Sequence, residues 1–135
     1  MRARFADPKS DLIFKRLFGE PSRSHLLVAL LNDLLELEGE NRIREVRHLS
    51  EAHRPHVPEL KYSIVDVRCT DERGRSFVVE MQVLNVEAFE KRVVYNVAKA
   101  YTNQLDVGQV YPDLNDVIGI SICDFELLPR KDKPQ

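Results

Sequence analysis

Two carboxylates near the middle of two neighbouring strand patterns are the residues of this chain best suited to chemistry. Asp66 lies in the apolar, β-branched run 61–70, and Glu80 lies in the similar run 76–84. Acidic residues are depleted in strands because a charge fits poorly on a half-buried pleated surface. A bound divalent cation or a shared proton would explain why two of them stand there.

The turn between the two runs determines how they pair. Gly74 is the only turn residue that enters the left-handed region freely, which favours a three-residue loop over residues 72–74. In such a loop Asp71 faces Arg75 across the base of the turn. The register of the whole hairpin then follows by counting outward from this pair.

Counting five residues outward from Asp71 and from Arg75 reaches the two acids, Asp66 and Glu80. Asp66 is placed directly opposite Glu80, with β-carbons about 4.5–5.5 Å apart on one face. Gln82 projects from the same face, two residues further along its strand. An alternative stays open, in which Arg68, diagonal to Glu80, pairs with it and the face is merely solvated.

The elements that must position this hairpin follow from hydrophobic periodicity and turn residues. A strand, a crossover helix and a further strand in succession imply a parallel pairing and an α/β sandwich. We predict helices at 11–18, 24–37 and 88–107, the first between Ser10 as N-cap and Gly19, and the second ended by Gly39. We predict strands at 42–49, 61–70, 76–84 and 117–123, and we expect the last strand to be buried on both faces.

Two further sets of polar residues have competing interpretations. The outer flank of the helix over 88–107 carries a polar band that could contact a phosphate backbone, although such a band is more often only solvated. Its members are Arg92, Tyr95, Asn96, Lys99 and Asn103. His48, His53 and His56 suggest a zinc site, but no second pair of ligands completes the set. Ordinary loop and strand histidines are therefore the favoured interpretation.

Length and composition limit the class of protein. The 135 residues suffice for one domain, expected over 1–128, followed by a loose polar tail over 129–135. Twenty basic and 22 acidic residues give a net charge of −2, unlike a strongly basic nucleic-acid binder. The longest apolar run, 26–31, is too short to cross a membrane. Cys69 and Cys123 do not have the spacing of a disulfide or a metal site, so we expect a cytoplasmic protein with reduced thiols.

Several short motifs, in their order and spacing, together resemble the Rpn-type family of recombination-promoting nucleases, also called putative transposases, in the PD-(D/E)XK nuclease superfamily. The resemblance covers the chain from Asp7 to about Phe125. The motifs are Asp7-Pro8, Asp11, Phe14-Lys15, Leu17-Phe18-Gly19, Leu30-Leu31-Asn32, Lys61 to Val67, Val79-Glu80-Met81-Gln82, Arg92 with Tyr95, Tyr101 and Gln104, and Asp124-Phe125.

The resemblance implies an α/β fold with a restriction-endonuclease-like core, a mixed sheet of about four strands flanked by helices in the order α-α-β-β-β-α-β. It implies a metal-dependent DNA endonuclease linked to recombination or transposition, with Mg²⁺ or Mn²⁺ as cofactor and no small-molecule cofactor beyond the metal. DNA is the expected partner, a membrane is not, and homodimerisation is left open. Asp66 and Glu80 carry over as metal ligands, and the carbonyl of Met81 completes the shell.

Gln82 stands where the superfamily usually has a lysine, although the Rpn-type family commonly has glutamine there. Glutamine can orient a water molecule but carries no charge and is no general base. A compensating cation could come from Lys15 or from Lys61, and Asp11 could serve as an accessory acid. Family members are usually longer, so the chain is expected to be a truncated or remnant form.

Two other functions remain as alternatives to the nuclease. The first is a degenerate, non-catalytic relative that binds DNA or protein, which the near-neutral charge, the missing lysine and the short chain favour. The second is an unrelated α/β domain in which the acid pair has only a structural use.

Overall fold

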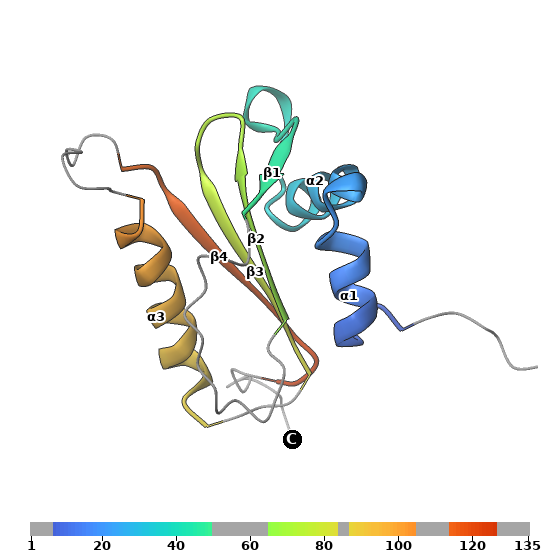
Figure 1. Ribbon diagram of the computed structural model, residues 1–135, viewed down its shortest axis with the longest axis vertical. Coiled ribbons are helices and arrows are strands. Elements are labelled where there is room, and N and C mark those ends of the chain that lie inside the picture. The colour runs from blue at the N-terminus through green and yellow to red at the C-terminus, as the bar shows by residue number, and fades with distance from the viewer. Residues whose placement is uncertain (1–6, 50–64, 84–86, 105–113, 127–135) are drawn as a thin grey trace, which may run out of the picture.

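The computed structural model describes residues 7–49, 65–83, 87–104 and 114–126. Three α-helices and a four-stranded sheet are found within these ranges (Figure 1). The elements are α1 (Asp11–Phe18), the short 3-10 helix η1 (Pro21–Arg23), α2 (Ser24–Leu34), the 3-10 helix η2 (Gly39–Asn41), β1 (Val46–His48), β2 (Val65–Asp71), β3 (Ser76–Gln82), α3 (Phe89–Thr102) and β4 (Val117–Cys123). No helix among the described residues is long and apolar enough to cross a membrane.

The sheet is mixed, with the strand order β1-β2-β3-β4. β1 and β3 both pair antiparallel with β2, whereas β4 runs parallel to β3 after the crossover through α3. The predicted α/β class, the four-stranded mixed sheet and the order of helices and strands are therefore confirmed.

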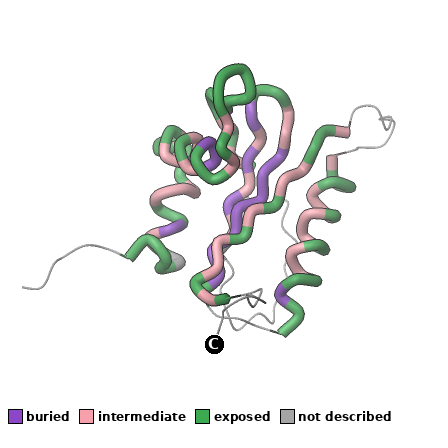
Figure 2. The backbone as a smooth tube through the Cα atoms, turned by 180° about the vertical axis from the view of Figure 1, so that it is seen from behind, coloured by how far each residue is buried: buried purple, intermediate pink, exposed green. Residues whose placement is uncertain are grey.

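Helices cover both faces of this sheet, α1 and α2 on one side and α3 on the other (Figure 1). Strand alternation sends β2 and β3 side chains to the two faces in turn. One set forms the apolar core with α1 and α2, and the buried backbone positions concentrate on the central strands (Figure 2). That core consists of Phe14, Leu27, Leu31, Ile43, Val67, Cys69, Phe77, Val79 and Met81. The alternate set, which includes both candidate acids, therefore lies on the face that α3 covers.

The second helix ends three residues earlier than predicted. Glu36 adopts the left-handed conformation, with φ of 51°, and the N–H of Leu37 donates to the carbonyl of Asn32. This 6→1 bond after a left-handed residue is a Schellman ending, which satisfies carbonyls that the helix leaves open. Gly39, the predicted stop, instead begins η2.

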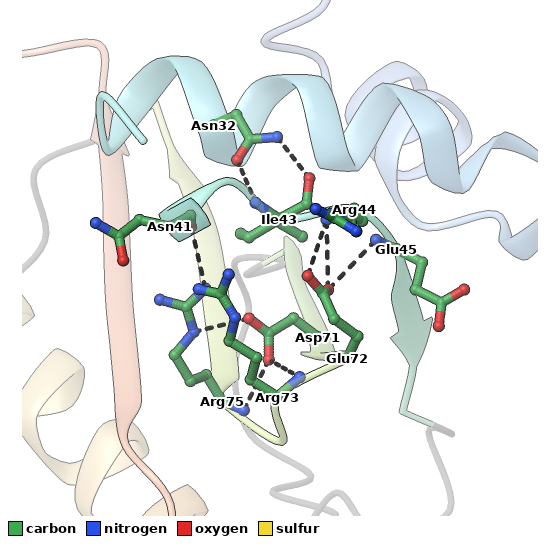
Figure 3. Close-up of polar contacts among 9 residues, drawn as sticks. All are labelled: Asn32, Asn41, Ile43, Arg44, Glu45, Asp71, Glu72, Arg73 and Arg75. Carbon is green, nitrogen blue, oxygen red and sulfur yellow. Dashed lines mark hydrogen bonds and ion pairs between the residues drawn. The ribbon is translucent and has the colours of Figure 1, made fainter. Parts of the chain in front are cut away.

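The first strand is shorter than the predicted 42–49 because side chains take over the pairing of its first half. Asn32 accepts from the N–H of Ile43 at 2.8 Å and donates to its carbonyl at 2.9 Å. The carboxylate of Glu72 accepts from the N–H groups of Arg44 and Glu45 (Figure 3). Regular pairing in the sheet therefore begins only at Val46.

The hairpin has the predicted three-residue loop. Gly74 has a φ of 80°, and the N–H of Asp71 donates to the carbonyl of Arg75 at 3.0 Å. The buried Asp71 carboxylate also accepts from the N–H groups of Arg73 and Arg75 and pairs with the Arg75 guanidinium at 2.7 Å (Figure 3). One carboxylate thus fixes the whole turn, because charge-assisted bonds of this kind are among the stronger ones.

The fourth strand has the predicted bounds, but the prediction that both its faces are buried was wrong. Within the described part of the chain β4 pairs only with β3 and ends the sheet, and Gly119 and Ser121 on it are exposed. Its apolar run therefore reflects an edge strand packed mainly through Ile118, Ile120 and Ile122 on the core side.

Candidate functional site

Asp66 and Glu80 are direct partners in the register of β2 and β3, as the turn arithmetic predicts. Directly opposite residues of an antiparallel pair project from the same face. That face lies beneath α3, and Glu80 is only 2% exposed. The two acids therefore face each other on this side of the sheet, Glu80 buried and Asp66 half-buried.

The charge of Asp66 is compensated within its own strand. Arg68 Nε donates to Asp66 Oδ2 at 2.9 Å, and the two side chains are 14% and 11% exposed. Residues two apart on a strand share a face, which makes this pairing local. The alternative in which Arg68 neutralises Glu80 is therefore not the arrangement found.

Glu80 is instead held by the helix. Asn96 Nδ2 on α3 donates to Glu80 Oε1 at 2.9 Å. Among the described residues Oε2 of the same carboxylate is buried without a hydrogen-bond partner. An unsatisfied buried polar atom costs about 1–3 kcal/mol, and more when it is charged. Such an atom beside a second carboxylate is suited to receive a cation.

Gln82 is also held from α3. Arg92 Nη2 donates to Gln82 Oε1 at 2.9 Å, and the guanidinium carbon lies 5.1 Å from the centre of the Phe89 ring. Phe89 in turn makes an edge-to-face contact with Phe125, with the ring centres 5.8 Å apart. The predicted outer band of α3 thus loses Arg92, which turns inward.

The two hydrogen bonds from α3 to β3 follow from matching residue spacings on the helix and the strand. Arg92 and Asn96 stand four residues apart, about 6.0 Å along a helix, while Gln82 and Glu80 stand two apart, about 6.6 Å along a strand. Helix and strand run in opposite directions, so each donor meets its own acceptor. The sequence placed Asn96 only in the polar band on the outer flank of this helix, although the matched spacing with Glu80 and Gln82 was a signal that it could face the acids.

Tyr95 and Lys99 remain on the outer flank of α3, where Tyr95 is exposed and Lys99 is half-buried. Tyr95 is 62% exposed, and Lys99 Nζ lies 5.8 Å from the centre of its ring. An aromatic ring with a stacked cation at the surface is a plausible element for contact with a phosphate backbone.

The structure does not bring the side chains of Lys15 and Met81 to the acid pair, and it does not describe those of Asp11 and Lys61. Lys15 is exposed on α1, which packs through Phe14 against the sheet face opposite to the acids. The Met81 side chain lies in that same core, so only its main chain could contact a ligand of the acids. Asp11 begins α1, but its side chain lies outside the description, as does Lys61 altogether.

Charge from the acid pair reaches the neighbouring strand. Cys123 is the register partner of Gln82 on β4. Burial, and after it the charge of Glu80, raises the pKa of the Cys123 thiol. The Glu80 carboxylate therefore acts electrostatically on this part of the site.

The arrangement fits a hard divalent cation. No group of three His, Cys, Asp or Glu residues that could hold a metal occurs in the described ranges. Mg²⁺ needs only one or two carboxylates, since waters and substrate phosphates fill its other positions. Asp66 and the unpartnered oxygen of Glu80 meet that requirement.

The zinc alternative gains no support from the structure. His48 Nε2 lies 2.8 Å from the carbonyl oxygen of Phe18, which can only accept, so this nitrogen is the donor. His53 and His56 lie outside the described residues.

A mixed sheet between helices, with facing acids on adjacent central strands, is consistent with the PD-(D/E)XK class of nuclease folds. Residues 8–134 match the sequence profile of the PD-(D/E)XK nuclease family transposases, and the chain belongs to this family. No curated protein and no solved structure is significantly similar to it.

Proposed function

We propose that this protein is a metal-dependent endonuclease that hydrolyses phosphodiester bonds in DNA and acts in recombination or transposition. One observation carries the proposal: Glu80 Oε2 is buried without a partner in the described chain, directly across the ladder from Asp66. Membership in a nuclease family supports the same reaction class.

In this proposal Asp66, Glu80 and the main-chain carbonyl of Met81 hold Mg²⁺ or Mn²⁺. A metal bound there would lower the pKa of a coordinated water and offset charge on the scissile phosphate. Asn96 keeps the Glu80 carboxylate in one orientation, and Arg68 keeps that of Asp66. Both supports reduce the reorganisation that the site would otherwise need during the reaction.

DNA would approach along the exposed flank of α3. Tyr95 and Lys99 offer a ring and a cation to the sugar-phosphate backbone, and Gln82 hydrogen-bonds a water or a phosphate oxygen. Lys15, Lys61 and Asp11 remain predictions from the family resemblance, the lysines as cations and Asp11 as an accessory acid. The two free thiols, Cys69 and Cys123, are consistent with the cytoplasm as the site of action, and homodimerisation stays open.

A non-catalytic DNA-binding or protein-binding role is the second candidate, and one observation favours it. Glu80 is 2% exposed, and both Glu80 and Gln82 are engaged by α3. Because α3 covers Glu80 and Gln82, a DNA phosphate would have to reach the acids from the side of Asp66, whose side chain is 11% exposed.

Incubation with supercoiled plasmid and Mg²⁺ or Mn²⁺ tests the proposal. We compare the wild type with the isosteric double variant Asp66→Asn, Glu80→Gln, and with Glu40→Gln as a control that removes an exposed carboxylate from η2. Cleavage should be lost in the double variant alone. Calorimetric titration with Mn²⁺ should likewise show binding to the wild type and the control only.

Equal cleavage by all three proteins would point to a contaminant and contradict the assignment. DNA binding without cleavage by the wild type would favour the non-catalytic role.

A further inference from the structure

In the described part of the chain, the side chain at position 82, beside the acid pair, carries no positive charge that could face a substrate. Two carboxylates and a DNA phosphate are all negative, and Arg68 is already paired with Asp66. Gln82, which projects toward the same space as Glu80, has no charge. Mg²⁺ or Mn²⁺ at the acids would offset part of this negative charge, and a positive side chain directed at the substrate would add to that effect.

Arg92 is the cation that the described structure brings to this point. Its Nη2 lies 2.9 Å from Gln82 Oε1, and its Nε is buried and finds no hydrogen-bond partner among the described residues. The guanidinium lies over the ring of Phe89, which in turn packs against Phe125. Arg92 is thus built into the site and keeps donor capacity that the described contacts do not use.

The contact also determines which end of the glutamine amide faces the acids. A guanidinium has five N–H donors and no acceptor, so it can bond only to the amide oxygen. The NH₂ group of Gln82 must then point away from Arg92. Gln82 therefore enters the site as a hydrogen-bond donor with a positive charge directly behind it.

We propose that Arg92 is a positioning residue that locks Gln82 as a donor and supplies the positive charge that glutamine lacks. The pair of side chains then does what a single cationic side chain at position 82 would do. This inference rests on the proposed nuclease function. It gives Arg92 a role inside the site, in place of contact with the DNA backbone on the outer flank of α3.

Four variants separate these roles. Arg92→Met keeps an aliphatic stem over Phe89 but removes the charge and the donors, and Arg92→Lys keeps the charge without the planar fork. Gln82→Lys in the Arg92→Met background moves the cation to position 82. Lys91→Met is the matched control, since it removes an exposed cation from the same helix.

For each variant we measure plasmid cleavage at saturating DNA, DNA affinity in Ca²⁺, Mn²⁺ affinity and the thermal midpoint. Arg92→Met should lower the saturating cleavage rate by about 100-fold, as misplaced catalytic groups do, with DNA affinity unchanged. Arg92→Lys should lose less. Adding Gln82→Lys to Arg92→Met should restore roughly tenfold or more of the lost rate, whereas Lys91→Met should leave the saturating rate unchanged.

Three results would overturn the inference while leaving the nuclease proposal intact. These are a loss of DNA affinity without a loss of rate in Arg92→Met, no recovery on adding Gln82→Lys, or equal activity in Arg92→Met and wild type. If Arg92→Met does not fold, Arg92→Lys and the folded double variant decide by the same comparison. Absence of cleavage by the wild type would overturn the nuclease proposal and this inference together.

Discussion

A β-carbon on Gly119 would lie 2.5 Å from Val97 Cγ2, which is closer than real side chains approach. Helix α3 therefore rests on β4 at a position where only glycine leaves room. Arg92 and Asn96 on the same helix donate to Gln82 and Glu80 on β3. The close approach of α3 to β4 therefore sets the distance between the helix and the sheet at the candidate site.

Replacing Gly119 by alanine should push α3 away from the sheet. We expect the free energy of unfolding to fall by about 1–3 kcal/mol, the usual cost of overpacking, measured by urea denaturation. Cleavage should fall too, because the bonds to Glu80 and Gln82 lengthen. The double variant Gly119→Ala, Val97→Ala should recover much of both, and a Gly119→Ala protein as stable as wild type would show that the contact relaxes freely.

Asn32 should be essential to the junction between α2 and the sheet. It is 3% exposed and bonds both main-chain groups of Ile43. Asn32→Leu leaves that N–H and carbonyl unpaired, which should cost about 2–4 kcal/mol in urea unfolding. Asn103→Leu, at the exposed end of α3, is the control and should stay within about 0.5 kcal/mol of wild type. Similar losses in both variants would argue against a special role for the Asn32 amide.

Gly74 should be intolerant of a side chain for two reasons that can be separated. Its φ is 80°, and an added β-carbon would lie 3.1 Å from Asn115 Nδ2. Gly74→Ala should lose about 1–2 kcal/mol for the left-handed backbone alone, plus the contact. Gly39→Ala is the matched control, because Gly39 also has a positive φ but nothing within 4 Å. Amide exchange in β2 and β3 should rise in Gly74→Ala, and unchanged exchange would show that the turn does not hold the register.

Cys69 should make the protein less stable in alkali. Burial, and after it the charge of Asp71, raises the pKa of the Cys69 thiol to about 12 from 9.0. The unfolded chain then loses this proton first as the pH rises, so the stability present below pH 9 declines toward pH 12. The slope should approach 1.4 kcal/mol per pH unit, about one proton, in urea unfolding at pH 8 to 11. Cys69→Ala should show a shallower decline, and parallel slopes would contradict the assignment.

The hairpin and the order of elements were predictable because they depend on short-range constraints. A glycine in a three-residue loop sets the register, and strand alternation then places Asp66 opposite Glu80. The crossover through a helix imposed the parallel pairing of β4 with β3. Each of these steps needs only the sequence spacing and standard backbone geometry.

Side-chain substitution for main-chain pairing was not predictable in the same way. The alternating pattern over 42–49 suggested one strand, but Asn32 and Glu72 take the main-chain groups of its first half. The competition between a sheet partner and a nearby amide or carboxylate is decided only when α2 and the hairpin are packed together.

The sequence by itself therefore determined the acid pair, its register and the family to which the chain belongs. Only the tertiary structure decided that Asn96 holds Glu80 and that Arg92 turns inward to Gln82. The physical reason is that a helix can present any of its faces to a sheet. Its rotation and height are fixed by packing between distant residues, here Val97 against Gly119, which periodicity alone does not specify.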